Sequence, residues 1–266
     1  MTTRIIQGMA VEIDGEGEDL LCIHGLGGSS NTWTPLLPAL QGFRVIRPDL
    51  PGSARSLLPE DGLSIAGYVA ALQRLLQALD IATVHVLAHS MGTIVAQHLA
   101  VQAPQQVRSL ALFGPLTAPP DAGRPHIEAR AALARGGVAQ LQEIANAIVQ
   151  GATSKETKAQ QPAVLALVRE SVMRQSPQGY AQSCEALARA QPAAIEQIAV
   201  PTLLLTGDQD GVAPPASVAA MAARIPQARQ VVFEGCGHWT PYEMPAGCMR
   251  ELERFHASVT RQQPTD

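Results

Sequence analysis

The feature that most constrains the fold is residues 84–96, VHVLAHSMGTIVA, where an apolar, β-branched run passes into a helical pattern with no loop between them. This pattern predicts a strand, a sharp turn and a helix. Ala88 and Gly92, two positions before and two after Ser90, are small enough to let strand and helix approach each other. Ser90 is therefore a candidate nucleophile at a strained turn. The same motif also fits a serine whose hydroxyl caps a helix, so the rest of the chain must decide between the two interpretations.

The composition is that of one sizeable α/β core. Of 266 residues, 46% are hydrophobic and 16% charged, which excludes a disordered chain, and the net charge of −4 argues against nucleic acid or a membrane surface as a partner. The four cysteines lack CxxC spacing, so we expect reduced thiols and a cytoplasmic protein. Because no apolar run approaches 18 residues, we expect neither a signal peptide nor a transmembrane span.

Strand patterns alternate with helical ones along most of the chain, which predicts a mostly parallel, doubly wound sheet with right-handed crossovers. An antiparallel edge hairpin is expected first, and single strands follow. The expected hairpin and strands are residues 4–13, 20–23, 43–46, 84–88, 107–113, 202–206 and 230–233.

Residues 125–197 contain only helical patterns, separated by glycines and prolines. We expect them to form an all-helical cap, inserted after the sixth strand and placed over the carboxyl edge of the sheet, where ligands bind in open α/β folds. The predicted domains are therefore a core of residues 1–115 and 198–266 and a helical cap of residues 116–197.

Three loops follow predicted strands and bear on the role of Ser90. The first, residues 24–28 (HGLGG), has glycines that let backbone N–H groups face a bound anion, and the helix after it adds a positive dipole. A phosphate site is disfavoured because neither GxGxxG nor a P-loop motif is present. As an oxyanion hole, the loop would donate the N–H of Leu26 beside that of Met91, the residue after the nucleophile.

The other two loops offer an acid and a base. Asp208 and Asp210 lie directly after the strand at 202–206, and either carboxylate suits the orientation of an imidazole. His238 lies in the glycine-rich loop GCGHW, after the strand at 230–233. A lone histidine is more often structural, but a serine needs such a base to attack at neutral pH.

The chain order Ser, Asp, His, with each residue at the carboxyl end of a strand, resembles the α/β-hydrolase fold family. The resemblance covers nearly the whole chain, through HGLGG at 24–28, PDLPG at 48–52, the turn at 88–92, GDQDGVAP at 207–214 and GCGHWTPYEMP at 235–245. It implies the triad Ser90, Asp210 and His238, because the family's G-x-x-D spacing selects Asp210 over Asp208. In some family members the acid follows an earlier strand, which leaves Asp121 as an alternative.

The resemblance also implies a small set of substrate-contacting residues and no cofactor. Trp33 is similar to a packing or pocket-wall residue of the family's first helix. The expected substrate-binding residues are Gly25, Trp33, His89 and Trp239. No His, Cys or Asp cluster has metal-ligand spacing, so we expect neither a metal nor another cofactor.

A serine at the turn favours acyl transfer over the alkyl-ester chemistry of relatives that carry aspartate there. Residues 171–201 resemble the caps of 3-oxoadipate enol-lactonase-type hydrolases, with GYA and CxAL patterns at 179–187. We therefore expect a carboxylic ester or (enol-)lactone as substrate, and a monomer or homodimer. The alternatives are a C–C bond hydrolase of ring-cleavage dienoates, and a slowly hydrolysing ligand receptor on the same fold.

Overall fold

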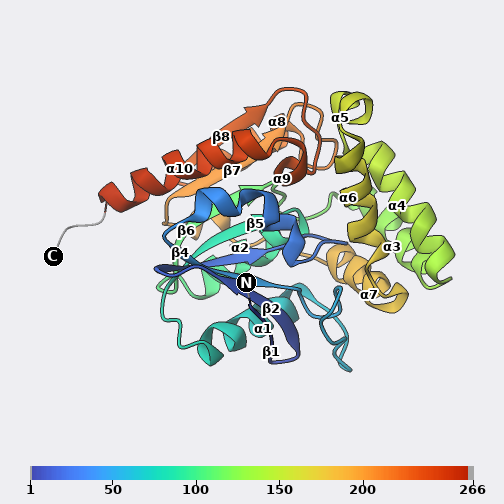
Figure 1. The fold of residues 1–266 in the computed structure, drawn as a ribbon, viewed down its shortest axis with the longest axis horizontal. Helices are drawn as coiled ribbons and strands as arrows, with labels where there is room; N and C mark the ends of the chain where they lie inside the picture. The colour runs from blue at the N-terminus through green and yellow to red at the C-terminus, as the bar shows by residue number, and fades with distance from the viewer. Residues whose placement is uncertain (1, 263–266) are drawn as a thin grey trace.

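A computed structural model describes residues 2–262 and contains one eight-stranded sheet (Figure 1). The strand order is β1-β2-β4-β3-β5-β6-β7-β8; β1 and β2 pair antiparallel and β2 joins β4 antiparallel, whereas β3 to β8 run parallel. This arrangement confirms the predicted sheet and its antiparallel edge. The strands are β1 (Thr2–Ile6), β2 (Met9–Asp14), β3 (Glu18–Ile23), β4 (Phe43–Pro48), β5 (Val84–His89), β6 (Val107–Phe113), β7 (Thr202–Gly207) and β8 (Ala228–Phe233).

The central strands are mostly apolar because helices cover both faces of the sheet. Every residue of β5 and β7 is buried. On one face they pack with α1 (Ile65–Ala78), α2 (Met91–Gln102) and α8 (Pro215–Ala222). On the other they pack with the 3-10 helix η1 (Ser30–Leu40) and α10 (Pro245–Gln262).

Between β6 and β7 the chain forms helices and no strand, as predicted for residues 125–197, and these helices gather at one end of the sheet, on the right of Figure 1. We call residues 121–197 the helical segment. Within it α3 packs on α7 and α4 on α6. Its division from the core as a domain of residues 116–197 stays a prediction. Its elements are η2 (Asp121–Gly123), α3 (Arg124–Ala134), α4 (Val138–Ala152), α5 (Lys155–Gln160), α6 (Pro162–Met173), α7 (Pro177–Ala188) and η3 (Ile195–Gln197).

Two local elements differ from those that the hydrophobic periodicity of the sequence predicts. The helix expected around Trp33 is a 3-10 helix, in which Pro35 and Pro38 lack the N–H groups that an α-helix needs. A short helix, α9 (Thr240–Glu243), follows the His238 loop. None of the helices within residues 2–262 has the length and apolar character that a membrane crossing requires.

Candidate active site

Ser90 lies at the junction of β5 and α2 with a strained backbone, at φ 52° and ψ −124°. A side chain in this left-handed region costs free energy that the surrounding structure must offset. Here the Ser90 N–H donates to the carbonyl of Phe113 at 2.9 Å, and its own carbonyl accepts from the Thr93 N–H and hydroxyl. The Ser90 hydroxyl makes no helix-capping bond. The N-cap interpretation is therefore wrong.

Two glycines let the first loop approach this turn closely. A Cβ on Gly92 would come within 2.6 Å of the carbonyl oxygens of Ile23 and His24 at the end of β3. A Cβ on Gly25 would come within 2.7 Å of Ser90 Cβ. Both positions therefore require glycine, and the 24–28 loop packs directly against Ser90.

Ser90, His238 and Asp210 form a continuous hydrogen-bonded chain. His238 Nε2 lies 2.8 Å from Ser90 Oγ, and His238 Nδ1 lies 2.8 Å from Asp210 Oδ2. The two alternative acids lie elsewhere: Asp208 accepts the Cys236 N–H, and the side chain of Asp121 is fully exposed beside Arg124. The structure thus brings together the three residues that the resemblance implies.

The Asp210 carboxylate is held in its ionised form. Besides His238, its oxygens accept the N–H groups of Val212 and Ala213 at 2.8 and 2.7 Å and the Thr206 hydroxyl at 3.2 Å. Burial alone would raise the pKa of Asp210, but the His238 charge and these hydrogen bonds outweigh it and lower the pKa to about 2. A buried, ionised acceptor fixes the proton of His238 on Nδ1 and leaves Nε2 free to accept from Ser90.

Gly114, directly after β6, leaves the space that the imidazole occupies. Its φ is 55°, and a Cβ there would come within 2.8 Å of His238 Cε1 and Nδ1. The loop that carries His238 is held by Glu243, whose buried carboxylate accepts the N–H groups of Gly237 and Trp239, each at 3.0 Å. Sequence reasoning missed this function of Glu243, although the residue lies within the matching motif at 235–245.

Both expected oxyanion donors are available. Among the described residues, neither the Leu26 N–H nor the Met91 N–H donates a hydrogen bond to the protein. His24 fixes the conformation of the loop. Its Nε2 accepts the Leu50 N–H at 2.8 Å, so the proton resides on Nδ1, which donates to the Gly25 carbonyl at 2.8 Å. Burial lowers the pKa of His24, which keeps the ring neutral in this role.

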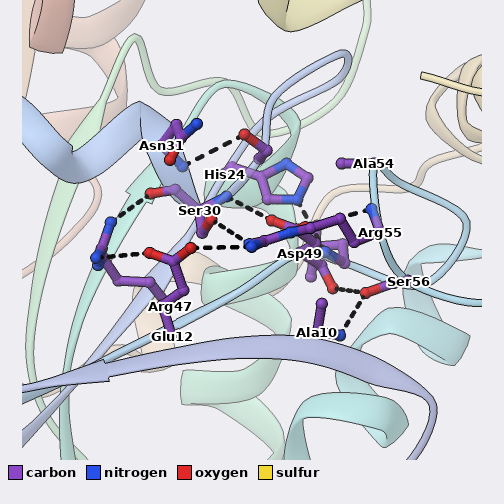
Figure 2. Close-up of polar contacts among 12 residues, drawn as sticks. Ala10, Glu12, His24, Ser30, Asn31, Arg47, Asp49, Ala54, Arg55 and Ser56 are labelled. Atoms are coloured by element: carbon purple, nitrogen blue, oxygen red, sulfur yellow. Dashed lines mark hydrogen bonds and ion pairs between the residues drawn. The ribbon is translucent and has the colours of Figure 1, made fainter. Parts of the chain in front are cut away.

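A buried polar network supports the same loop from the sheet side, as Figure 2 shows. Asp49, which follows β4, accepts the Ser30 N–H at 2.7 Å and the Arg55 Nε–H at 2.7 Å. Arg47 is fully buried, pairs with Glu12 at 2.8 Å and donates to the Ser30 carbonyl at 3.1 Å. The network joins strands and loops that are far apart in sequence, and no local sequence motif predicts it.

The helical segment holds the loop from the opposite side. The Gln175 amide nitrogen donates to the Gly27 and Gly28 carbonyls at 3.3 and 3.0 Å, and the Gln175 amide oxygen accepts the Ala54 N–H at 3.0 Å. The Ser171 hydroxyl donates to the Gly27 carbonyl at 2.7 Å. These are long-range contacts that the sequence analysis did not anticipate.

A cavity of about 750 Å³ opens beside Ser90 and His238. Its lining includes His89 and Trp239, as expected, together with Leu26. His89 Nε2 bonds the His238 carbonyl at 3.0 Å, and burial lowers the pKa of His89 to about 3, so the ring is neutral.

Two of the expected substrate-binding residues do not line this cavity. Trp33 is fully buried on the far face of the sheet and packs edge to face on Phe113, with ring centroids 5.4 Å apart. This placement corrects the expected pocket-wall function, because η1 directs the indole into the core. Gly25 abuts Ser90 instead, as its close approach requires. Within residues 2–262 no cluster of His, Cys, Asp or Glu is arranged to hold a metal ion.

Several known proteins are similar to this chain in sequence and in fold. An enol-lactonase from Burkholderia xenovorans superposes with a TM-score of 0.86 at 26% identity, over 96% of this chain and all of that one. An esterase from Thermogutta terrifontis has a TM-score of 0.90 at 23% identity, over 97% and 99% of the two chains, and shows the shared fold. A 2-hydroxy-6-oxononadienedioate/2-hydroxy-6-oxononatrienedioate hydrolase of Cupriavidus pinatubonensis is 28% identical over 85% of this chain and 82% of its own.

The match to a family extends over most of the chain, from the third strand to the start of the last helix. Residues 20–245 match the model of the alpha/beta hydrolase fold. They include the turn at Ser90, the two loops that carry Asp210 and His238, and the whole helical segment. The chain belongs to the alpha/beta hydrolase fold family.

Proposed function

We propose that the protein is a serine hydrolase that cleaves a carboxylic ester or a lactone through an acyl-enzyme on Ser90. The observation that carries this proposal is the hydrogen-bonded chain from Ser90 Oγ through His238 to Asp210, at the wall of a cavity large enough for a small molecule. No such chain is needed to stabilise a turn, and the strained backbone of Ser90 is itself a cost to stability.

The proposed reaction begins when Ser90 Oγ attacks the substrate carbonyl and His238 Nε2 takes the hydroxyl proton. The tetrahedral oxyanion accepts hydrogen bonds from the free N–H groups of Leu26 and Met91. His238 then gives the proton to the leaving oxygen, which departs as an alcohol or as the opened end of a lactone. Water repeats the sequence on the acyl-enzyme, and the acid and free Ser90 are released. Asp210 stabilises the imidazolium in both halves.

The helical segment completes the proposed site as a cap. Its residues form much of the cavity wall, so a bound ester would be enclosed between them and the triad. We infer that the cap domain comprises residues 116–197 and that it determines which small molecule is accepted. Because such a cover excludes water, the electrostatic contacts within the site become stronger.

A second candidate function is cleavage of a C–C bond. The relative from Cupriavidus pinatubonensis, named as a hydrolase of 2-hydroxy-6-oxo dienedioates, favours it. The similarity to an enol-lactonase favours lactone hydrolysis instead. Both reactions place a carbonyl beside Ser90, so they differ in the group that leaves.

A substrate panel distinguishes these functions. Wild type and Ser90→Ala are assayed with p-nitrophenyl acetate, simple lactones, enol-lactones and a vinylogous diketone dienoate, and Ser217→Ala, at an exposed site on α8, is the control. We expect hydrolysis of esters or lactones that falls roughly 10⁴-fold or more in Ser90→Ala only. Turnover of the dienoate alone would favour the C–C hydrolase. Full activity in Ser90→Ala would contradict the proposed nucleophile.

A further inference from the structure

The wall that the helical segment contributes to the cavity is mostly apolar. Its large side chains are aliphatic, and they cover the space in front of Ser90. They are Ile127, Leu133, Ile144, Ile148 and Leu187. Such a wall favours an apolar substrate and gives no charge preference by itself.

Arg130 on α3 is an exception in this wall. Its side chain is half-buried and lines the cavity. Among the residues that the structure describes, no carboxylate lies within ion-pair distance of its guanidinium. A half-buried guanidinium that lines a largely apolar cavity and has no ion-pair partner among the described residues can bind an anionic group that enters the cavity.

Tyr180 on α7 lies next to Arg130, because α3 packs on α7. Its side chain is only 1% exposed and lines the cavity, and its hydroxyl makes no close hydrogen bond, although the Arg130 guanidinium and the Cys184 thiol lie near it. Burial raises the pKa of Tyr180, and the nearby Arg130 charge opposes this only in part, so the hydroxyl remains a neutral donor. A buried hydroxyl without a partner costs free energy that a ligand atom can recover.

We propose that Arg130 and Tyr180 form a carboxylate-binding subsite, so that the preferred substrates carry a carboxylate remote from the ester or lactone bond. The guanidinium donates to the carboxylate oxygens, and the Tyr180 hydroxyl donates a further hydrogen bond. This inference rests on the proposed function, since it describes the substrate of that reaction. The net charge of −4 gives the protein no general attraction for anions, so the preference depends on this local pair.

Glu143 on α4 also lines the cavity, and it is more exposed than Arg130 and forms no ion pair with it among the described side chains. Its carboxylate weakens the attraction for an anion but does not neutralise the guanidinium. Glu143→Gln is therefore a useful opposite variant: it is expected to improve binding of an acid slightly, whereas Arg130→Gln weakens it.

The kinetic test compares two p-nitrophenyl esters that differ only in charge, 4-carboxybutanoate and its primary amide, 4-carbamoylbutanoate. In wild type we expect kcat/KM to be roughly 10- to 100-fold higher for the acid, mainly through KM. Arg130→Gln removes the difference, Tyr180→Phe reduces it, and Arg130→Lys restores part of it. Arg135→Gln, which removes a charge paired with Glu185 outside the cavity, leaves the preference intact.

A binding test separates this inference from the proposed reaction. Glutarate and glutaramide are titrated into Ser90→Ala and into Ser90→Ala/Arg130→Gln by calorimetry. We expect glutarate to bind at least tenfold more tightly than glutaramide, and only when Arg130 is present. Equal binding, or no binding of glutarate, overturns the subsite even if esters are hydrolysed. Selective glutarate binding without any Ser90-dependent hydrolysis would support the subsite and reject the serine hydrolase.

Discussion

The two walls of the cavity differ in how their key polar side chains are held. On the sheet side, Ser90, His238 and Asp210 are joined to one another by hydrogen bonds, and only the backbone N–H groups of Leu26 and Met91 await an acceptor. On the helical side, Arg130 has no ion-pair partner among the described residues and lies near the Tyr180 hydroxyl. A bonded triad is preorganised for chemistry, whereas a cation without a counter-charge can be completed by what binds. We therefore assign the chemistry to the first wall and substrate choice to the second.

Preorganisation on the sheet side has a cost that the fold offsets. The positive φ of Ser90 is of a kind that costs roughly 1–3 kcal/mol. Close packing of Gly25 and Gly92 against the turn and the buried network around Asp49 and Arg47 hold this conformation in place. Variants of this wall should therefore alter kcat, and variants of the helical wall should alter KM and selectivity.

The largest expected effect is that of Asp210→Asn. The amide cannot stabilise the imidazolium and leaves His238 free to adopt the wrong tautomer, so kcat should fall roughly 10³- to 10⁴-fold while KM changes little. Steady-state kinetics on p-nitrophenyl acetate measure this. Asp208→Asn, in the same turn, is the matched control and should retain nearly full activity because Asp208 contacts only the Cys236 N–H. Equal losses in both variants would remove the distinction between the two carboxylates.

The second largest expected effect is the loss of kcat in Gly114→Ala. The new Cβ would lie 2.8 Å from the His238 ring in a backbone region that alanine adopts poorly, so the ring must move. A displacement of about 1 Å in such a site lowers kcat by roughly 10²-fold. In Gly211→Ala the Cβ enters open space at the cavity wall and meets no protein atom, so the triad need not move and kcat should remain within about twofold. Retained activity in Gly114→Ala would show that the imidazole position is less constrained than we argue.

Acid stability tests whether Asp210 is as fully satisfied as its contacts imply. Its pKa is lowered from 3.8 to about 2, so the folded state favours the ionised form. This contribution, roughly 2 kcal/mol, is present above pH 4 and is lost as the pH falls from about 4 to about 2. Urea unfolding across this range should show a steeper loss of stability in wild type and Asp208→Asn than in Asp210→Asn. Parallel curves for all three would contradict the assigned environment.

The smallest effect tests the boundary between the two walls. Gln175 belongs to the helical segment, but it holds the loop that carries Leu26. We expect Gln175→Leu to lower kcat by roughly tenfold or less, because the Leu26 N–H would be displaced but not lost as an oxyanion donor. KM should change little. Gln178→Leu, at an exposed site on the next turn, should match wild type. A change confined to KM would place Gln175 with the substrate-selecting residues instead.

The sequence predicted the parts of this structure that depend on local pattern and order. Strand and helix periodicity located the sheet. The order of residues at strand ends pointed to Ser90, an aspartate and His238, and the family resemblance then selected Asp210 over Asp208. Trp33 was expected either to pack or to line the pocket; it packs on Phe113 in the core, and the helical pattern alone could not decide between the two. The contacts of Arg47 with Glu12 and of Gln175 with Gly27 and Gly28 could not be predicted, since these partners lie 35 to 148 residues away in the chain.

Arg130 shows the same limit for function. In the sequence it is one of several arginines in a helical stretch, and charge alone does not separate it from Arg135. The difference is tertiary: Arg135 pairs with Glu185, whereas Arg130 faces the cavity. Which polar groups are left without partners can be learned only from the assembled fold.

The most direct test of the sheet wall's function is to trap the covalent intermediate. Wild type is mixed with p-nitrophenyl acetate, quenched in acid within milliseconds and digested, and peptides are analysed by mass spectrometry. We predict one acetyl group on Ser90 that forms with the burst of p-nitrophenol and is absent in Ser90→Ala. Acetylation at another residue, or a burst that persists in Ser90→Ala, would contradict an acyl-enzyme on Ser90.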